Sequence, residues 1–242
     1  MIDSEIIKTP SVDKAKYYTK LVNRVLYDIK PSSILDVGGG AAPFNHVTHI
    51  IDQLPWRDDI HLNGWGYAPV MKKPIYSKDT YLQRNFFDLP WPYHDKQFDF
   101  IWCTQTLEDI YDPFIICNEM ERIGKQGFIQ TPNVFSEVLE NFWHHKWFIR
   151  WNHNRMQFLP KSGRFFYAFA EFNADKVREL RKFHDDSENV YRGVNYFWRN
   201  KINIEVLTPS SFAEYREILK EWFDEVVTQI KEGKFFDGMD YI

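Results

Sequence analysis

Apolar residues in the first half of the chain form short continuous runs, separated by stretches with helical spacing. Such runs are typical of strands that are buried on both faces of a parallel sheet. They occupy residues 34–37, 47–52, 81–87, 98–103 and 127–132. The alternation predicts an α/β fold: a doubly wound, mostly parallel, Rossmann-like sheet with helices on both faces and an aromatic-rich cap insertion.

Two stretches between these runs carry helix signals. Residues 11–29 have apolar positions at helical spacing, with Ser11 as N-cap and Pro31 after the end. A second helix is predicted over 113–123, where Asp112 is the N-cap and Pro113 the first helical residue. Residues 53–80 lack a clear period and predict a long loop with at most one short helix.

The second half of the chain has a different pattern. Residues 174–184 predict a charged helix, and 193–206 predict a β-hairpin or two adjoining strands. A last helix begins after Ser210 or Ser211 and runs to about residue 230. The tail is either an edge strand or a loose terminus. We expect one domain over 1–242, with a cofactor-binding core (11–133), a substrate cap (134–200) and a C-terminal strand and helix (201–242).

The composition limits the classes of protein to which the chain can belong. Hydrophobic residues make up 44% of the 242 residues, which is enough for a sizeable core, and aromatic residues make up 18%. The net charge of −4 disfavours broad binding to nucleic acid or membranes. The polar first residues and the lack of a long apolar run predict a cytoplasmic protein without a membrane span. Two cysteines without a CxxC spacing fit reduced thiols. The oligomeric state stays open.

A glycine turn follows the first predicted strand. Gly38, Gly39 and Gly40 come directly after a run that contains Asp36. Glycines permit positive φ and let a ligand approach the backbone closely. Ligands in open α/β sheets bind at the carboxyl ends of strands. The turn is therefore a candidate nucleotide site, although a simple tight turn would look the same.

Two later carboxylates also follow predicted strands. Asp52 is placed to accept hydrogen bonds from ribose hydroxyls, and Asp88 could meet the exocyclic amine of an adenine. The alternatives are an exposed strand-end residue for Asp52 and ordinary turn chemistry for Asp88. Asp52 follows Gly38 by only 14 positions, whereas a βαβ unit needs about 30 residues. We expect the first crossover helix to be very short, or replaced by a loop that contains Pro43.

Basic and aromatic residues are interleaved over 141–166, where no Asp or Glu occurs. The composition suits an anionic, planar partner, such as a phosphorylated or nucleotide-linked small molecule or a single-stranded nucleic acid. An amphipathic cap with its basic edge in water is the alternative. A metal site is not expected, because His144, His145 and His153 lack the i, i+4 spacing and have no carboxylate close by in sequence.

Four segments together resemble class I S-adenosylmethionine-dependent methyltransferases: SILDVGGGAAPF, THIID, NFFDLPWP and the stretch from FDFIWCTQTLED to QTPN. The likeness is greatest to a bacterial small-molecule subgroup with a shortened first crossover. It implies S-adenosylmethionine as cofactor and a role for each matching residue. Asp36 and the three glycines would hold the methionine portion, Asp52 the ribose, and Asp88 with the Leu89 backbone the adenine. Thr104 and Gln105 would face the sulfonium and the substrate.

The sequence departs from that subgroup after the fourth strand. The subgroup usually has Ser-His-Val-Leu-Glu-His, and here Gln105 and Asp109 replace both histidines. The resemblance includes a later His-basic-Trp run, matched by His145, Lys146 and Trp147. We therefore predict His145 and Asp109 as catalytic, with Glu108 and His144 as other sources of a base. Adjacent histidines could equally be structural or merely exposed, and an amine acceptor needs no strong base.

The predicted substrate-binding residues surround this region: Gln105, His144, Lys146, Trp147 and Arg150. The favoured function is methyl transfer to an oxygen or nitrogen of a small, anionic acceptor, such as a sugar or natural-product intermediate. The alternatives are a nucleic-acid methyltransferase, a dinucleotide-dependent oxidoreductase, which Pro43 disfavours at the third glycine position, and a non-catalytic interaction module.

Overall fold

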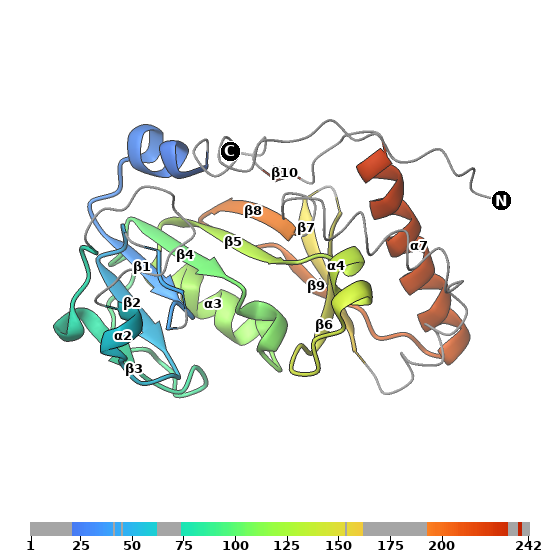
Figure 1. Cartoon of the computed structure of the whole chain (residues 1–242), viewed down its shortest axis with the longest axis horizontal. Helices are drawn as coiled ribbons and strands as arrows, with labels where there is room; N and C mark the ends of the chain where they lie inside the picture. The colour runs from blue at the N-terminus through green and yellow to red at the C-terminus, as the bar shows by residue number, and fades with distance from the viewer. Residues whose placement is uncertain are drawn as a thin grey trace.

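The computed structural model describes residues 21–40, 42–44, 46–61, 74–152, 154–161, 193–231 and 237–238. They form a seven-stranded sheet and a three-stranded sheet, with helices packed against both (Figure 1). None of the described helices is both long enough and apolar enough to cross a membrane.

The larger sheet has the strand order β10-β8-β5-β4-β1-β2-β3. Five of its strands run parallel: β1 (Ile34–Val37), β2 (His49–Asp52), β3 (Tyr81–Gln83), β4 (Phe100–Thr104) and β5 (Gln126–Pro132). The carboxyl ends of these strands therefore meet at one edge. The arrangement confirms the predicted Rossmann-like α/β fold.

Helices cover the two faces of this sheet. Residues 21–29 are helical, with a π-helical turn over Arg24–Ile29, and Lys30 takes a left-handed conformation before Pro31. The rest of the predicted first helix lies outside the described residues. Helix α3 (Pro113–Ile123) begins at Asp112, whose carboxylate accepts hydrogen bonds from the N–H groups of Phe114 and Ile115. The end of the first helix before Pro31 and the start of α3 at Asp112 follow the predicted signals.

The loops between the first three strands contain little helix. The described residues between β1 and β2 form no helix, as the short spacing predicted. Only α2 (Asp58–His61) and the 3₁₀ turn η2 (Lys78–Thr80) are formed in the described part of 53–80. The predicted strand over 81–87 is too long, because β3 ends at Gln83. The Asn85 side chain accepts the Phe87 N–H there and turns the chain before Asp88.

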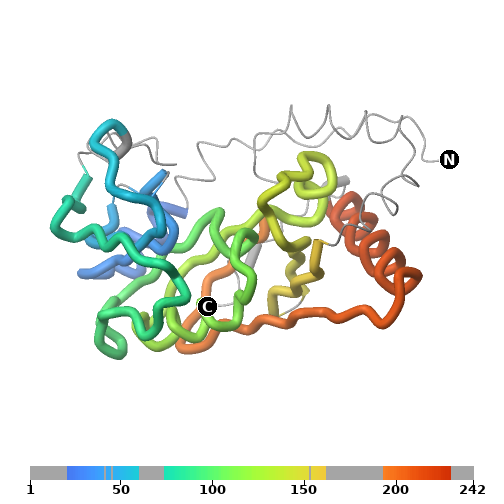
Figure 2. The backbone as a smooth tube through the Cα atoms, turned by 90° about the horizontal axis from the view of Figure 1, so that it is seen from below, coloured from blue at the N-terminus to red at the C-terminus, as the bar shows by residue number. Residues whose placement is uncertain are grey.

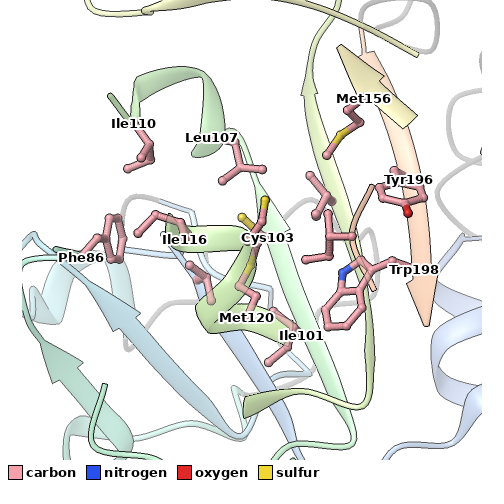
Figure 3. Packing of buried hydrophobic residues seen from close by; sticks show 14 of the residues in the cluster. Phe86, Ile101, Cys103, Leu107, Ile110, Ile116, Met120, Met156, Tyr196 and Trp198 are labelled. Carbon is pink, nitrogen blue, oxygen red and sulfur yellow. The ribbon is translucent and has the colours of Figure 1, made fainter. Parts of the chain in front are cut away.

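Alternate side chains of the central strands fill two cores. Ile34, Phe100 and Trp102 pack with the helix at 21–29 on one face. Leu35, Ile101 and Cys103 pack with α3 on the other (Figure 3). That second core also includes Met156, Tyr196 and other residues that come from much later in the chain.

The smaller sheet lies between the larger sheet and the last helix (Figures 1 and 2). It consists of β6 (Trp147–Asn152), β7 (Arg155–Pro160) and β9 (Ile204–Val206), with β6 and β7 antiparallel and β9 parallel to β7. Helices α4 (Val134–Glu140) and α7 (Phe212–Lys231) pack together beside it around a third core. The Ser211 hydroxyl accepts the Glu214 N–H at the start of α7, so Ser211 is the cap.

Of the two alternatives predicted for 193–206, the hairpin is wrong: two strands form there, but they lie in different sheets. Strand β8 (Gly193–Arg199) pairs antiparallel with β5 in the larger sheet, whereas β9 joins the smaller sheet. Six consecutive residues of β8 are buried, so this strand needs cover on both faces, which a hairpin on the surface would not supply. In the tail, β10 (Asp237–Gly238) forms a short edge strand on β8. The predicted helix at 174–184 lies outside the described residues.

Candidate functional site

Two buried carboxylates organise the loop after β1. Asp36 accepts a hydrogen bond from the Phe44 N–H at 2.9 Å. Asp52, at the end of β2, accepts from the Gly40 N–H at 2.8 Å and the Leu54 N–H at 2.6 Å. Both side chains are almost fully buried. The loop is therefore built around the two acidic residues that the sequence placed beside the glycines.

The three glycines leave no space for side chains. Gly38 has a φ of +84°, and a Cβ there would lie 2.0 Å from the Thr106 hydroxyl oxygen. A Cβ on Gly39 would lie 2.5 Å from the Asp36 carboxylate, and one on Gly40 would lie 2.6 Å from the Asp52 carboxylate. The turn needs glycine because it wraps closely around both carboxylates.

Burial controls the charge of this loop. It raises the pKa of Asp36 to about 8; the Phe44 N–H opposes the rise and the nearby Asp52 adds to it. Burial also raises the pKa of Tyr76 to about 12, with the Asp36 charge adding to it. A cationic ligand would offset the cost of two neighbouring buried carboxylates. The loop is thus suited to a ligand with a positive charge.

Thr106 is a part of this site that sequence reasoning missed. Its buried hydroxyl is 3.2 Å from the Val37 carbonyl oxygen and 3.1 Å from the Thr104 carbonyl oxygen, and its single proton is shared between these two acceptors. It thereby connects the end of β1 to the loop that follows β4. The sequence carries no signal for this contact, because 69 positions separate Thr106 from Val37.

Asp88 and Leu89 lie on an exposed loop beyond β3. The Arg84 guanidinium donates to the Asp88 carbonyl at 2.7 Å. Buried Phe86 and Trp91 hold the loop on either side. No described contact joins Asp88 or Leu89 to the glycine turn, so their role toward an adenine stays a prediction.

The loop after β4 is held by backbone contacts. Thr104 ends the strand half-buried, and Gln105 is exposed with a φ of +53°. The Gln105 N–H donates to the Gln130 carbonyl at 2.9 Å. The 3₁₀ turn η3 (Leu107–Asp109) follows, and burial raises the pKa of its Glu108 well above the usual range. Gln105 therefore lies at the strand edge where the resemblance places the substrate.

A buried ion pair lies beside η3. His145 Nδ1 is 2.5 Å from Glu137 Oε2, and Lys161 forms an ion pair with the other oxygen of Glu137. Lys161 also donates to the Phe142 carbonyl at 2.8 Å. Glu137 comes from α4, His145 lies two residues before β6, and Lys161 immediately follows β7. The elements of the second half thus fix the ring of His145.

The structure brings Asp109 to the two adjacent histidines. One ligand atom each from Asp109, His144 and His145 lies within 4.8 Å of the others. His144 is half-buried and His145 is buried. The sequence separates this carboxylate from the histidines by more than thirty positions, so spacing could not reveal the cluster.

The other predicted substrate residues have separate positions. Lys146 lies 5.0 Å from the centre of the Tyr111 ring, and the Trp147 indole donates to the Ile110 carbonyl at 2.6 Å. Both contacts hold the loop after η3. The Arg150 guanidinium packs over Trp222 and pairs with two glutamates of α7, Glu221 and Glu225. These partners occupy Arg150, so it is left out of the acceptor site proposed below.

The fold and the glycine loop define the class of protein. A parallel sheet with a glycine turn after β1 and an acidic residue at the end of β2 is the arrangement predicted for S-adenosylmethionine-dependent methyltransferases. The model of one protein family, described as methionine biosynthesis protein MetW, matches residues 22–188. The chain belongs to this family. The match and the strand order confirm the predicted class, an enzyme class whose cofactor is S-adenosylmethionine.

Solved structures of methyltransferases resemble the chain at low identity. The methyltransferase domain of bacterial CtHen1 is 14% identical over 53% of this chain and 72% of its own, with a TM-score of 0.36. A SAM-dependent methyltransferase from Aquifex aeolicus is 19% identical over 51% and 74%, with a TM-score of 0.28. The plantazolicin methyltransferase BpumL, solved with a desmethylplantazolicin analogue and SAH, is 11% identical over 89% and 77%, with a TM-score of 0.34. No curated protein matches the chain in sequence.

Proposed function

We propose that the protein transfers the methyl group of S-adenosylmethionine to an oxygen or nitrogen of a small, anionic acceptor. The observation that carries this proposal is the pair of buried carboxylates, Asp36 and Asp52, around which the glycine turn is wrapped. The ammonium and sulfonium groups of the cofactor supply the positive charge that this loop lacks. The Asp52 carboxylate accepts hydrogen bonds from the ribose hydroxyls.

The acceptor binds beside the loop after β4. Gln105, His144, Lys146 and Trp147 form this side of the site, and Lys146 supplies positive charge for an anionic group. Methyl transfer needs an in-line nucleophile about 3 Å from the methyl carbon, so positioning is the main requirement. His145 and Asp109 take up the acceptor's proton; Glu137 orients His145 for this role. The name of the family associates it with methionine biosynthesis, which agrees with a small-molecule acceptor.

The free, buried thiols of Cys103 and Cys117 support a cytoplasmic location, where thiols stay reduced.

Calorimetric titration with S-adenosylhomocysteine tests the cofactor site. We expect one binding site per chain in the wild-type protein. Asp52→Ala should weaken binding by at least about tenfold, the effect of losing about 1.4 kcal/mol of hydrogen bonding to a charged group. Asp79→Ala, an exposed carboxylate in η2, is the matched control and should bind as the wild type does. Equal affinities in all three proteins would refute the proposal.

Transfer of a radiolabelled methyl group tests the acceptor class. Phosphorylated or carboxylated small molecules should accept the label in preference to their neutral counterparts. Lys146→Ala should reduce this preference, without altering the affinity for S-adenosylhomocysteine. A preference for neutral acceptors would contradict the anionic assignment.

A further inference from the structure

Three side chains near the proposed acceptor site have the chemistry of metal ligands. We propose that Asp109, His144 and His145 bind one divalent transition-metal ion. Their ligand atoms lie within 4.8 Å of one another. Metal–nitrogen and metal–oxygen bonds are about 2.0–2.2 Å long, so ligand atoms around one ion lie about 3 Å apart. Neither Asp109 nor His144 is fully buried, so small rotations of their side chains can close that difference.

The surroundings of His145 support a metal-binding role. Its Nδ1 atom lies 2.5 Å from a carboxylate oxygen of Glu137, to which it donates its proton. In the neutral ring with its proton on Nδ1, the Nε2 atom has a lone pair that can bind a metal. A carboxylate behind a histidine ligand is the usual outer shell of metal sites, where it fixes the ring and its tautomer. Lys161 forms an ion pair with the second oxygen of Glu137. Both oxygens of Glu137 therefore have partners, and Glu137 holds the His145 ring in place before any metal binds.

The rings of His144 and His145 are oriented so that both can bind the same ion. Their centroids are 4.5 Å apart and their planes are at 84°. Rings that lie perpendicular to each other can direct their nitrogens at one point from different sides. Asp109 approaches from η3, an element on another part of the chain, and completes a three-ligand set.

The ligand set selects the kind of metal. Two imidazole nitrogens and one carboxylate favour borderline ions, such as Zn²⁺, Fe²⁺ or Co²⁺, over Mg²⁺ and Ca²⁺, which prefer oxygen ligands. Three protein ligands leave coordination positions open, as in metal sites that take part in chemistry. The cluster is therefore a site at which a further ligand can bind.

The role of the ion rests on the proposed function. An acceptor hydroxyl bound at an open position loses its proton more easily, because the cation lowers its pKa. With the ion bound, the second oxygen of Asp109 would take that proton, and His145 would act as a base only in the metal-free protein. The acceptor oxygen then forms a bond to the methyl carbon, the carbon–sulfur bond breaks, and its electron pair stays on sulfur. The products are the methylated acceptor, S-adenosylhomocysteine and one proton.

Binding of Zn²⁺ to chelator-treated protein, measured by calorimetry, tests the site. We expect one ion per chain, with Co²⁺ replacing it and giving the visible absorption of a site with nitrogen ligands. Asp109→Asn and His144→Gln should each weaken Zn²⁺ binding by about tenfold or more. His94→Gln removes an exposed histidine elsewhere and should leave binding unchanged.

Two results would overturn the inference: no stoichiometric Zn²⁺ binding by the wild type, or equal binding by Asp109→Asn and His144→Gln. Titration of the same metal-free proteins with S-adenosylhomocysteine separates this inference from the proposed function. Normal cofactor binding with no specific Zn²⁺ binding would remove the metal site alone. Zn²⁺ binding without cofactor binding would refute the proposed function and leave the metal site in place.

Discussion

Asp36 has a buried carboxyl whose pKa is raised to about 8. Between the ordinary carboxyl pKa of 3.8 and about 8, the folded protein holds a proton that the unfolded chain has lost. The stabilisation that comes from this retained proton is complete below pH 3.8. It falls as the pH rises from 3.8 towards about 8. Asp36→Asn should therefore flatten the decrease in the free energy of unfolding, measured by urea denaturation from about pH 5 to about pH 8.

The same proton opposes cofactor binding. In the proposed site, the carboxylate form of Asp36 holds the ammonium group of the cofactor, so binding would release the proton. The affinity for S-adenosylhomocysteine should rise with pH, by up to about tenfold per pH unit between pH 6 and pH 7.5. Calorimetry in buffers of different ionisation enthalpy measures the proton release directly. An affinity that does not change with pH in the wild type would contradict this role.

Gly39 tests whether the turn must lie against the carboxylates. A Cβ there would lie 2.5 Å from the Asp36 carboxylate, whereas a Cβ on Gly193 has its nearest neighbour at 3.3 Å. Gly39→Ala should weaken S-adenosylhomocysteine binding by at least about tenfold, because the turn must move away from Asp36. Gly193→Ala is the matched control, with near-normal affinity. Circular dichroism checks that both variants are folded, and normal binding by Gly39→Ala would show that the close fit is unimportant.

Some candidate site residues could be predicted from the sequence, and others could not. The roles predicted for Asp36, Asp52 and the glycines rest on local order, because each lies in, at the end of, or directly after a predicted strand. The cluster of Asp109 with His144 and His145 depends on packing between η3 and the residues before β6. No spacing rule brings these residues together, so the sequence led to the expectation of no metal site.

The N-cap of helix α3, which the sequence predicted at Asp112, can be tested by its effect on stability. The Asp112 carboxylate accepts hydrogen bonds from two N–H groups at the start of α3. Asp112→Ala leaves these groups without a protein partner and should lower the free energy of unfolding by about 1 kcal/mol. Asp112→Asn keeps the acceptor oxygen and should lose much less. The comparison by urea denaturation would contradict the capping role if both variants lost the same amount.

The smaller sheet was not predictable at the level of elements. Strand β6 is buried on both faces, yet Arg150 interrupts its apolar run. That charge is neutralised by Glu221 and Glu225, about 70 positions later on α7, and its guanidinium packs on Trp222. In the sequence, the basic side chains over 141–166 therefore resemble a solvated cap. Local patterns predicted the central strands, whose neighbours in the sheet are mostly close in the chain.

At the scale of the molecule, one hydrophobic core joins the two sheets. It contains Ile101 and Cys103 of β4, Met156 and Phe158 of β7, and Tyr196 of β8 (Figure 3). Strands that share a core cannot open separately without exposing apolar area on both sides. We therefore expect a single cooperative unfolding transition, with the calorimetric enthalpy equal to the van't Hoff enthalpy.

Met156→Ala tests the coupling between the two sheets. The substitution is in β7 of the smaller sheet, which does not carry the glycine turn. It should lower the stability of the whole chain by about 2–5 kcal/mol, the usual cost of such a cavity. Hydrogen exchange in β4 and in β7 should speed up together, because both strands contribute residues to the shared core. Saturating S-adenosylhomocysteine, at about 100 times its dissociation constant, should restore about 2.7 kcal/mol to both elements. Protection that falls in β7 and α7 while β4 is unchanged would show that the two sheets unfold as separate units, and cofactor binding would then stabilise only the larger one.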